Sequence, residues 1–384
     1  MKKFFMFAAM ASVALASCVK NDPAPSFAED QAEISFAAPV LSPNVKSATE
    51  FGNDFPTDVK IGVWAYYYVN PTNAEAEANF TTFGEGDLYM GSAQGGLPIQ
   101  YTQLSADPLS GTWKHAVNKY YWPKNGALTF TAYAPYTDAN ALLANTTDSG
   151  VTFTDYVVPT TNSLMEDLLY SERVYDATVA NLTNPDRSNV YEGVSLVFKH
   201  ALSSIRFTLK AAADYNPTTL IVKKIELLNV VSKGSFDQNL ADADDATSAK
   251  GVWTLSADDV DKKIYTVDLP STDGITLSST EVYYANNGQT AAPVSANGKQ
   301  VTDFILLPQT LDNIQLRVTF TLKNDQMDAP IEQVLTKKLI TDTITEWHEG
   351  SRYTYNLAIA LDEIYFEPTV TPWVDVDVTD VPNL

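Results

Sequence analysis

Short apolar and β-branched runs, separated by clusters of Gly, Asn, Asp and Pro, constrain the fold of this chain most strongly. Many of them alternate apolar and polar residues at the period of two that is typical of strands. The runs lie at residues 61–69, 127–136, 194–200, 204–210, 220–231, 263–269, 303–308, 314–322, 332–340 and 352–361. Helical periodicity is weak, with hints of a helical turn only at residues 140–144 and 163–169. The pattern predicts an all-β fold of the sandwich or barrel type.

The chain is long enough for more than one such domain. Its 384 residues allow two or three domains of about 100–200 residues each. A polar, turn-rich stretch at 180–193 separates two apolar halves, and we place the domain boundary there, between 47–190 and 191–384.

The charge excludes one class of partner. The chain carries 25 Lys and Arg residues against 47 Asp and Glu residues, a net charge of −22. Because such a surface repels phosphate backbones, we expect no nucleic-acid partner.

The first residues predict export. Lys2 and Lys3 precede an apolar run at 4–15 that is too short to span a bilayer but suits a signal peptide. Leu15-Ala16-Ser17-Cys18 follows and resembles the bacterial lipobox, and Cys18 is the only cysteine. We therefore predict a signal peptide at 1–17 and lipidation of Cys18, with an ordinary signal peptide and a chance cysteine as the alternative. No stretch of the chain reaches 18 apolar residues, so no transmembrane helix is expected.

Motifs for catalysis and cofactor binding are missing. There is no G-x-S-x-G, P-loop or dinucleotide-binding pattern, and the single cysteine excludes disulfide scaffolds and cysteine-based zinc sites. His200 and His348 are interpreted as structural. Asp242, Asp244 and Asp245 lie in the acidic stretch 236–251. This stretch is predicted to be a solvated loop. The alternative is that the three aspartates bind calcium, although the glycine and distal glutamate of the full calcium-loop pattern are missing. We predict no enzyme activity, catalytic residue, metal or cofactor.

Aromatic residues cluster around Trp64 and Trp122. Aromatic side chains in strands commonly form cores and cross-strand pairs, whereas exposed rings can stack on sugars. Both interpretations stay open at this point, with Trp64 and Trp122 as the candidate glycan-stacking residues.

Both ends of the chain that follows the predicted signal peptide have the pattern of amphipathic strands, next to polar or proline-bearing stretches. At 33–41 the side chains expected on one face are Ile34, Phe36, Ala38 and Val40; at 373–381 they are Val374, Val376 and Val378, with Asp375 and Asp377 opposite. Such strands could belong to their own sheets, or one could leave and be replaced by the other from a second subunit, which is β-strand addition. Spacing alone does not choose between the two.

Several segments together resemble the fimbrillins of Bacteroidetes, the type V pilins. In chain order they are Leu15–Cys18, Tyr121–Pro123, Leu128–Pro135, Asp167–Tyr170, Leu196–Ile205, Leu307–Gln309, Trp347–Tyr355 and Pro372–Trp373.

The resemblance implies two transthyretin-like β-sandwich domains in tandem and a surface lipoprotein precursor, with acyl chains such as palmitate on Cys18. It implies that a trypsin-like protease cuts after Lys46, removing a propeptide at 18–46 that contains the first strand. The C-terminal tail at about 373–381, from Trp373 through Val378 and beyond, would then fill the open groove of another subunit.

The expected role is a structural, non-enzymatic subunit of a fimbria at the cell outer membrane, serving adhesion and biofilm formation. The expected partners are other fimbrillin subunits, the outer membrane through the lipid anchor, the processing protease and a host or bacterial surface ligand. The alternative is a tip adhesin or a glycan-binding outer-membrane lipoprotein.

Overall fold

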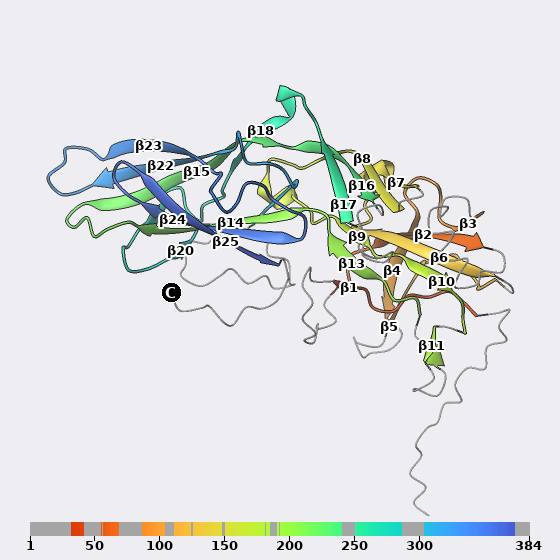
Figure 1. Ribbon diagram of the computed structural model, residues 1–384. Helices are drawn as coiled ribbons and strands as arrows, with labels where there is room; N and C mark the ends of the chain where they lie inside the picture. The colour runs from red at the N-terminus through yellow and green to blue at the C-terminus, as the bar shows by residue number, and fades with distance from the viewer. Residues whose placement is uncertain are drawn as a thin grey trace, which may run out of the picture.

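The computed structural model describes residues 32–41, 55, 57–68, 87–103, 111–123, 126–147, 150–180, 182–184, 190–191, 193–239, 250–285 and 303–372. Within these ranges the chain is almost entirely β-structure, which confirms the predicted fold class. In Figure 1 the C-terminal strands lie at the left and the N-terminal strands at the right of an elongated molecule.

The N-terminal sheet has nine strands among the described residues. Its main path runs β1 (Val40–Leu41), β13 (Val197–His200), β9 (Leu169–Ser171), β6 (Ala127–Ala134), β2 (Ile61–Tyr68), β4 (Leu97–Gln103) and β5 (Gly111–Lys114), while β10 (Val174–Ala177) pairs with β6 and β3 (Asp87–Met90) with β2. All eight residues of β6 are buried, because both faces of this central strand are covered. Phe130 and Leu128 join a core made by N-terminal residues, whereas Tyr133 joins the larger core toward the C-terminal half.

Two sheets of five strands, again counted over the described residues, form the C-terminal part. One contains β20 (Tyr283–Tyr284), β14 (Ser203–Ala211), β24 (Ser351–Ile359), β25 (Ile364–Pro372) and β21 (Phe304–Leu306); the other contains β18 (Lys262–Thr266), β15 (Thr219–Val231), β22 (Gln315–Lys323), β23 (Ile331–Lys338) and β19 (Ile275–Thr276). Every second residue of β22 from Leu316 to Phe320 is buried, as expected for a strand with one face on a core.

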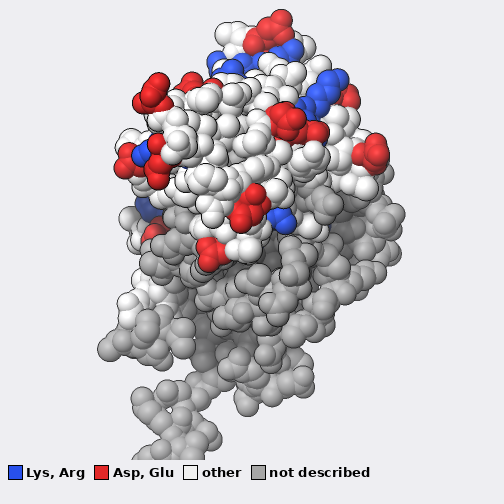
Figure 2. All heavy atoms as spheres, turned by 90° about the vertical axis from the view of Figure 1, so that its left-hand side faces the viewer, with Lys and Arg blue, Asp and Glu red and all other residues white. Residues whose placement is uncertain are grey.

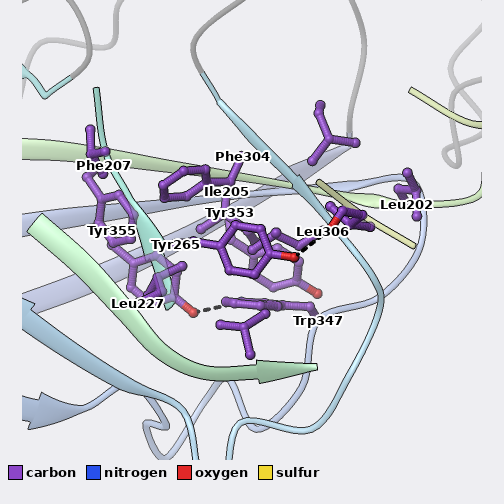
Figure 3. Close-up of a cluster of buried hydrophobic side chains, with 14 of the residues drawn as sticks. Leu202, Ile205, Phe207, Leu227, Tyr265, Phe304, Leu306, Trp347, Tyr353 and Tyr355 are labelled. Atoms are coloured by element: carbon purple, nitrogen blue, oxygen red, sulfur yellow. Dashed lines mark hydrogen bonds between the residues drawn. The ribbon is translucent and has the colours of Figure 1, made fainter. Parts of the chain in front are cut away.

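The two C-terminal sheets share one core, so they form a sandwich. Figure 3 shows its aromatic centre, where the Phe207 and Tyr355 rings stack at 5.7 Å and the Trp347 indole N–H donates to the Tyr355 hydroxyl at 3.0 Å. Because the Trp347 indole N–H finds an acceptor inside the core, its burial does not leave this donor unpaired.

A four-stranded sheet connects the two halves of the chain. Its order is β17 (Lys250–Leu255), β16 (Lys233–Asn239), β8 (Gly150–Val157) and β7 (Ala144–Thr147). The hairpin β16–β17 therefore extends from the C-terminal half onto strands of the N-terminal half (Figure 1). The larger core contains residues of both halves, such as Tyr133 and Phe236.

The remaining elements are short. They are the hairpin β11 (Thr183–Asn184) and β12 (Val190–Tyr191), the helix α2 (Asp138–Leu143), and the 3-10 turns η2 (Asn162–Leu164) and η4 (Asp259–Asp261). Thr137 caps α2, because its hydroxyl accepts the N–H of Asn140. Each of the ten predicted strand runs contains a strand. The helical turn expected at 140–144 is present as α2, whereas that expected at 163–169 is limited to η2 at its start, and residue 169 already belongs to β9.

The crossing between the halves lies slightly beyond the predicted boundary. The strand β13 ends at His200 and belongs to the N-terminal sheet, and β14 begins at Ser203 in the C-terminal sandwich. The chain thus passes from one to the other at Ala201 and Leu202. The division at residues 190 and 191, and the count of two tandem domains, stay predictions.

Figure 2 looks onto the end of the C-terminal sandwich. Acidic and basic side chains are interspersed among uncharged ones on the described part of this face, and no basic stripe runs across it. Among the described residues, no helix is long and apolar enough to cross a membrane.

Candidate functional site

Residues 32–41, which we name the closing segment, lie between two other parts of the chain. On one side is the first wall, residues 111–122; on the other is the second wall, residues 193–198. In Figure 1, β1 at the end of the closing segment lies beside β13. Residues 32–37 of the segment are therefore flanked on both sides, while β1 is the end strand of the sheet path.

Backbone hydrogen bonds connect the closing segment to the first wall. The N–H of Ile34 donates to the Tyr120 carbonyl at 2.7 Å, and the N–H of Phe36 donates to the Trp113 carbonyl at 2.9 Å. Trp122 donates to the Ala32 carbonyl at 3.0 Å. Bridges at Glu33 and Phe36 are antiparallel to this wall.

A second set of backbone bonds holds the opposite edge. The N–H of Val194 donates to the Ser35 carbonyl at 2.9 Å, the N–H of Ala37 to the Val194 carbonyl at 3.0 Å, and the N–H of Val40 to the Leu196 carbonyl at 3.0 Å. The pairing with this wall is parallel. Because β13 and β5 stand near opposite ends of the sheet path, the closing segment joins those ends.

The side chains of the closing segment are part of the N-terminal core. Ile34 and Phe36 are 3% and 2% exposed, and the Phe36 ring meets Phe130 edge-on at 5.7 Å. Burial of each of these two side chains contributes about 1.5–3 kcal/mol. The segment therefore stabilises the fold through its core contacts as well as through its two backbone ladders.

The predicted alternation holds only as far as Phe36. Ala32, Ile34 and Phe36 are buried, but Ala38 is exposed and Val40 is half-buried, so the expectation that Ala38 faces inward with them is wrong. Pro39 is buried instead. Pro39 has no N–H to donate, and regular strand structure is confined to β1 and the isolated bridges.

Gly193 makes the close approach of the second wall possible. It adopts φ +90°, and a Cβ there would lie 2.8 Å from both the Phe36 carbonyl carbon and the Ala37 nitrogen. Only glycine combines this backbone conformation with that contact. The second wall is thus shaped to the backbone of the closing segment.

Glu33 lies at the polar margin of the site. Its carboxylate oxygens lie 3.9 Å from Lys114 Nζ and 3.7 Å from Lys119 Nζ. The Glu33 and Lys114 side chains are each 29% exposed and that of Lys119 is 62% exposed. The first wall therefore presents two cations to the one acid of the closing segment.

Trp64 and Trp122, the candidate glycan-stacking residues, are buried. Trp64 is fully buried, its N–H donates to the Ser92 carbonyl at 2.8 Å, and its ring lies 5.4 Å from that of Tyr133. Trp122 is 3% exposed and meets Phe130 edge-on at 5.8 Å. Neither ring is accessible for stacking on a sugar, because both side chains are buried.

The histidines occupy structural positions. His200 is buried, and its Nδ1 lies 2.8 Å from Oδ2 of the half-buried Asp167. His115 Nδ1 accepts the N–H groups of Val117 and Asn118 and so caps a turn. His348 lies 3.5 Å from Glu346 on the surface.

Several predicted site residues lie outside the described part of the chain. They are Cys18, Lys46, Asp242, Asp244, Asp245, Trp373, Val374, Val376 and Val378. No cluster of acidic, His or Cys side chains that could hold a metal ion occurs among the described residues. The last described strand, β25, ends at Pro372 as the outer strand of its sheet, directly before the predicted tail.

Sequence reasoning missed both walls of the site. Trp113, Gly193 and Val194 lie far from the closing segment in the chain, and no motif marks their contact with it. A glycine just before the run at 194–200 was the one available signal, since a glycine beside a strand can indicate a close backbone approach.

Comparisons with known proteins agree with this architecture. A family model described as fimbrillin-like matches residues 48–373. A fimbrial protein from Bacteroides vulgatus has a solved structure that aligns with a TM-score of 0.54 at 16% identity, covering 89% of this chain and all of that one (100%).

Two further solved structures are also similar. A proposed cell adhesion protein from Bacteroides uniformis aligns with a TM-score of 0.48 at 16% identity, covering 89% of this chain and 98% of its own. Another from Bacteroides ovatus aligns with a TM-score of 0.46 at 15% identity, covering 90% and 98%. No curated protein matches the chain significantly.

Proposed function

Because the chain belongs to the fimbrillin-like family, we propose that it is a structural subunit of a surface fimbria that polymerises by strand exchange. The observation that carries the exchange mechanism is the closing segment. It supplies buried side chains to a core and backbone bonds to two walls, yet residues 42–54 alone connect it to the described residues that follow it in the chain.

The proposed maturation begins with a lipoprotein precursor. Cys18 carries the lipid that tethers it to the outer membrane, and a trypsin-like protease cuts after Lys46. Lys46 follows the closing segment by five residues and is the only basic residue between Leu41 and Phe51. The cut would separate residues 18–46 from the body without breaking any of the strands β2 to β25.

Loss of the closing segment would expose an apolar groove between the first wall and the second wall. Such a groove is unstable in water, because its backbone donors and acceptors and its apolar side chains both need partners. The donor tail, residues 373–381 of another subunit, has alternating valines and aspartates that suit a groove with one buried and one solvated side. Repetition of this joint would produce a filament that serves adhesion and biofilm formation.

The tip-adhesin and glycan-binding alternative has no support from the two tryptophans that suggested it, since both are buried. The proposed role is therefore structural and non-enzymatic.

Limited trypsin treatment of the full precursor, followed by mass spectrometry and electron microscopy, tests the proposal. We expect a cut after Lys46, loss of residues 18–46 and appearance of filaments. A Lys46→Gln precursor should stay monomeric under the same treatment. Clean cleavage at Lys46 that yields only monomers would contradict the polymerising role.

A further inference from the structure

The Glu33 contact with Lys114 and Lys119 has a consequence for the replacement of the closing segment. When the segment leaves, both lysines lose the carboxylate that lies within 4 Å of them. Lys114 and Lys119 stay with the body, since both belong to the first wall. The open groove would then have a cationic margin at one defined position along its length.

The closing segment and the donor tail share one pattern. Ala32-Glu33-Ile34-Ser35-Phe36 has apolar residues at its first, third and fifth positions and an acid at the second. Within residues 373–384, Val374-Asp375-Val376-Asp377-Val378 is the one window that matches, and it matches in both chain directions. Asp375 takes the place of Glu33 if the tail runs in the direction of the closing segment, and Asp377 does so if the tail is reversed.

We propose that Lys114 and Lys119 are specificity-determining residues of the groove, which select a donor strand carrying an aspartate between two inward-facing valines. This inference rests on the strand-exchange function proposed above and names the residues that set partner choice and register.

Backbone pairing alone is a poor selector, because any extended segment can form the same ladder hydrogen bonds. If the tail runs in the direction of the closing segment, a shift by two residues one way would place Trp373 at the Glu33 position beside the lysines. A shift by two residues the other way would place Asp380 at the buried Phe36 position. Charge and apolarity together therefore define one register. The overall charge adds to the argument. With a net charge of −22, two subunits repel each other at long range, and a pair of lysines at the groove gives the acidic tail a local attraction.

A displacement assay on the full chain tests the inference. Unlipidated Lys20→Gln precursor, in which trypsin cannot cut between Cys18 and the closing segment, is labelled with a fluorophore on Cys18, its only cysteine, cut after Lys46, and freed of protease. At a subunit concentration too low for self-assembly the labelled fragment with the closing segment remains bound, and an excess of a synthetic 373–384 peptide displaces it, which lowers the fluorescence anisotropy. The rate is compared between the natural peptide and peptides carrying D375N/D377N or D375K/D377K.

We expect displacement by the lysine peptide to be slower than by the natural peptide, on the order of tenfold, with the asparagine peptide in between. On the Lys114→Glu/Lys119→Glu acceptor the order of the displacement rates should reverse, with the lysine peptide fastest and the natural peptide slowest. The ratio of two peptides on one acceptor removes any effect of the substitutions on the closing segment itself. Lys323→Glu/Lys338→Glu, which makes the same charge change on exposed residues of β22 and β23, should keep the natural preference.

Peptides that carry only D375N or only D377N show which aspartate interacts with the lysines. They thereby show whether the tail runs in the same direction as the closing segment or in the reverse direction. Equal rates for the natural and lysine peptides, or a preference that fails to reverse on the charge-reversed acceptor, would overturn the inference while leaving strand exchange intact. No displacement by any peptide would remove both the proposed exchange and this inference. The peptide series on the natural acceptor is decisive even if the charge-reversed acceptor does not fold.

Discussion

Gly193 faces the backbone of Phe36 so closely that a single added methyl group would lie 2.8 Å from the Phe36 carbonyl carbon. This contact joins a residue of the second wall to the centre of the closing segment. A substitution at Gly193 can therefore disturb the packing of the closing segment without altering any residue of that segment.

Gly193→Ala should loosen the closing segment in the uncut precursor. The added Cβ meets backbone atoms at a φ of +90°, so we expect a loss of about 1–3 kcal/mol in the free energy of unfolding. Hydrogen exchange should accelerate at the amides of Ile34 and Phe36. Gly274→Ala is the matched control, since its φ is +81° and its Cβ would meet Val222. It should cost stability while leaving the exchange of those two amides unchanged, and equal protection in both variants would argue against the contact.

Phe36→Ala should destabilise the precursor by about 3–5 kcal/mol, because it removes a buried ring from the N-terminal core. Chemical denaturation of the uncut protein measures this loss. Ala38→Ser, at an exposed position of the same segment, should change stability by less than about 0.5 kcal/mol.

The Phe36→Ala effect also depends on maturation. If the proposed maturation occurs, this residue leaves with the propeptide before assembly, so filaments made from the variant precursor should be as stable as natural ones. A difference that persists in the filaments would show that the segment stays in place.

A chain ending at Pro372 should fold normally but fail to polymerise. The truncation keeps the full ladder between β24 and β25 and removes only the donor tail. After cleavage it should stay monomeric, and in mixtures with the full chain it should shorten filaments, as seen by electron microscopy. Val376→Asp keeps the tail length and should also block assembly, whereas Thr379→Ser should not. Filaments from the truncated chain would exclude this tail as the donor.

The C-terminal sandwich should lose stability in acid through Glu226. Arg317 donates to one Glu226 oxygen at 2.7 Å and Lys224 lies 2.6 Å from the other. The hydrogen bond from Arg317, followed by that from Lys224, holds the pKa of the Glu226 carboxyl below its ordinary value of 4.5. A lowered pKa in the folded state means that the contribution is complete above pH 4.5 and is lost as the pH falls through the folded-state pKa.

Glu226→Gln should therefore lower the free energy of unfolding by about 1–3 kcal/mol at pH 7 and by less at pH 3. Denaturant titrations across this pH range measure the difference. Glu332→Gln, on the exposed face of β23, should show no comparable dependence. A penalty for Glu226→Gln that does not shrink in acid would rule out the ion pair as its source.

The strands of the C-terminal sandwich were predictable because their signal is local. The runs that contain β15, β22 and β24 combine β-branched and aromatic residues with a period of two, and burial in the structure follows much of that alternation. The break at Pro39 was harder to place, since a proline at a strand end is compatible with several positions of the chain around it. The alternation failed at Ala38 because the segment advances four residues between its pairings at Phe36 and Val40, while the second wall advances three, from Val194 to Val197.

The sequence by itself determined the all-β class, the inward positions of Ile34 and Phe36 and the family resemblance, because these depend on residue types at short spacing. Only the tertiary structure decided that the closing segment has two walls, that β16 and β17 extend the sheet of β8, and that Glu33 meets Lys114 and Lys119. Such pairings join residues tens of positions or more apart along the chain. Many strands have similar capacity to form ladder hydrogen bonds, so local sequence does not determine which strands pair. The pairing is set by the arrangement that buries all the apolar faces at once.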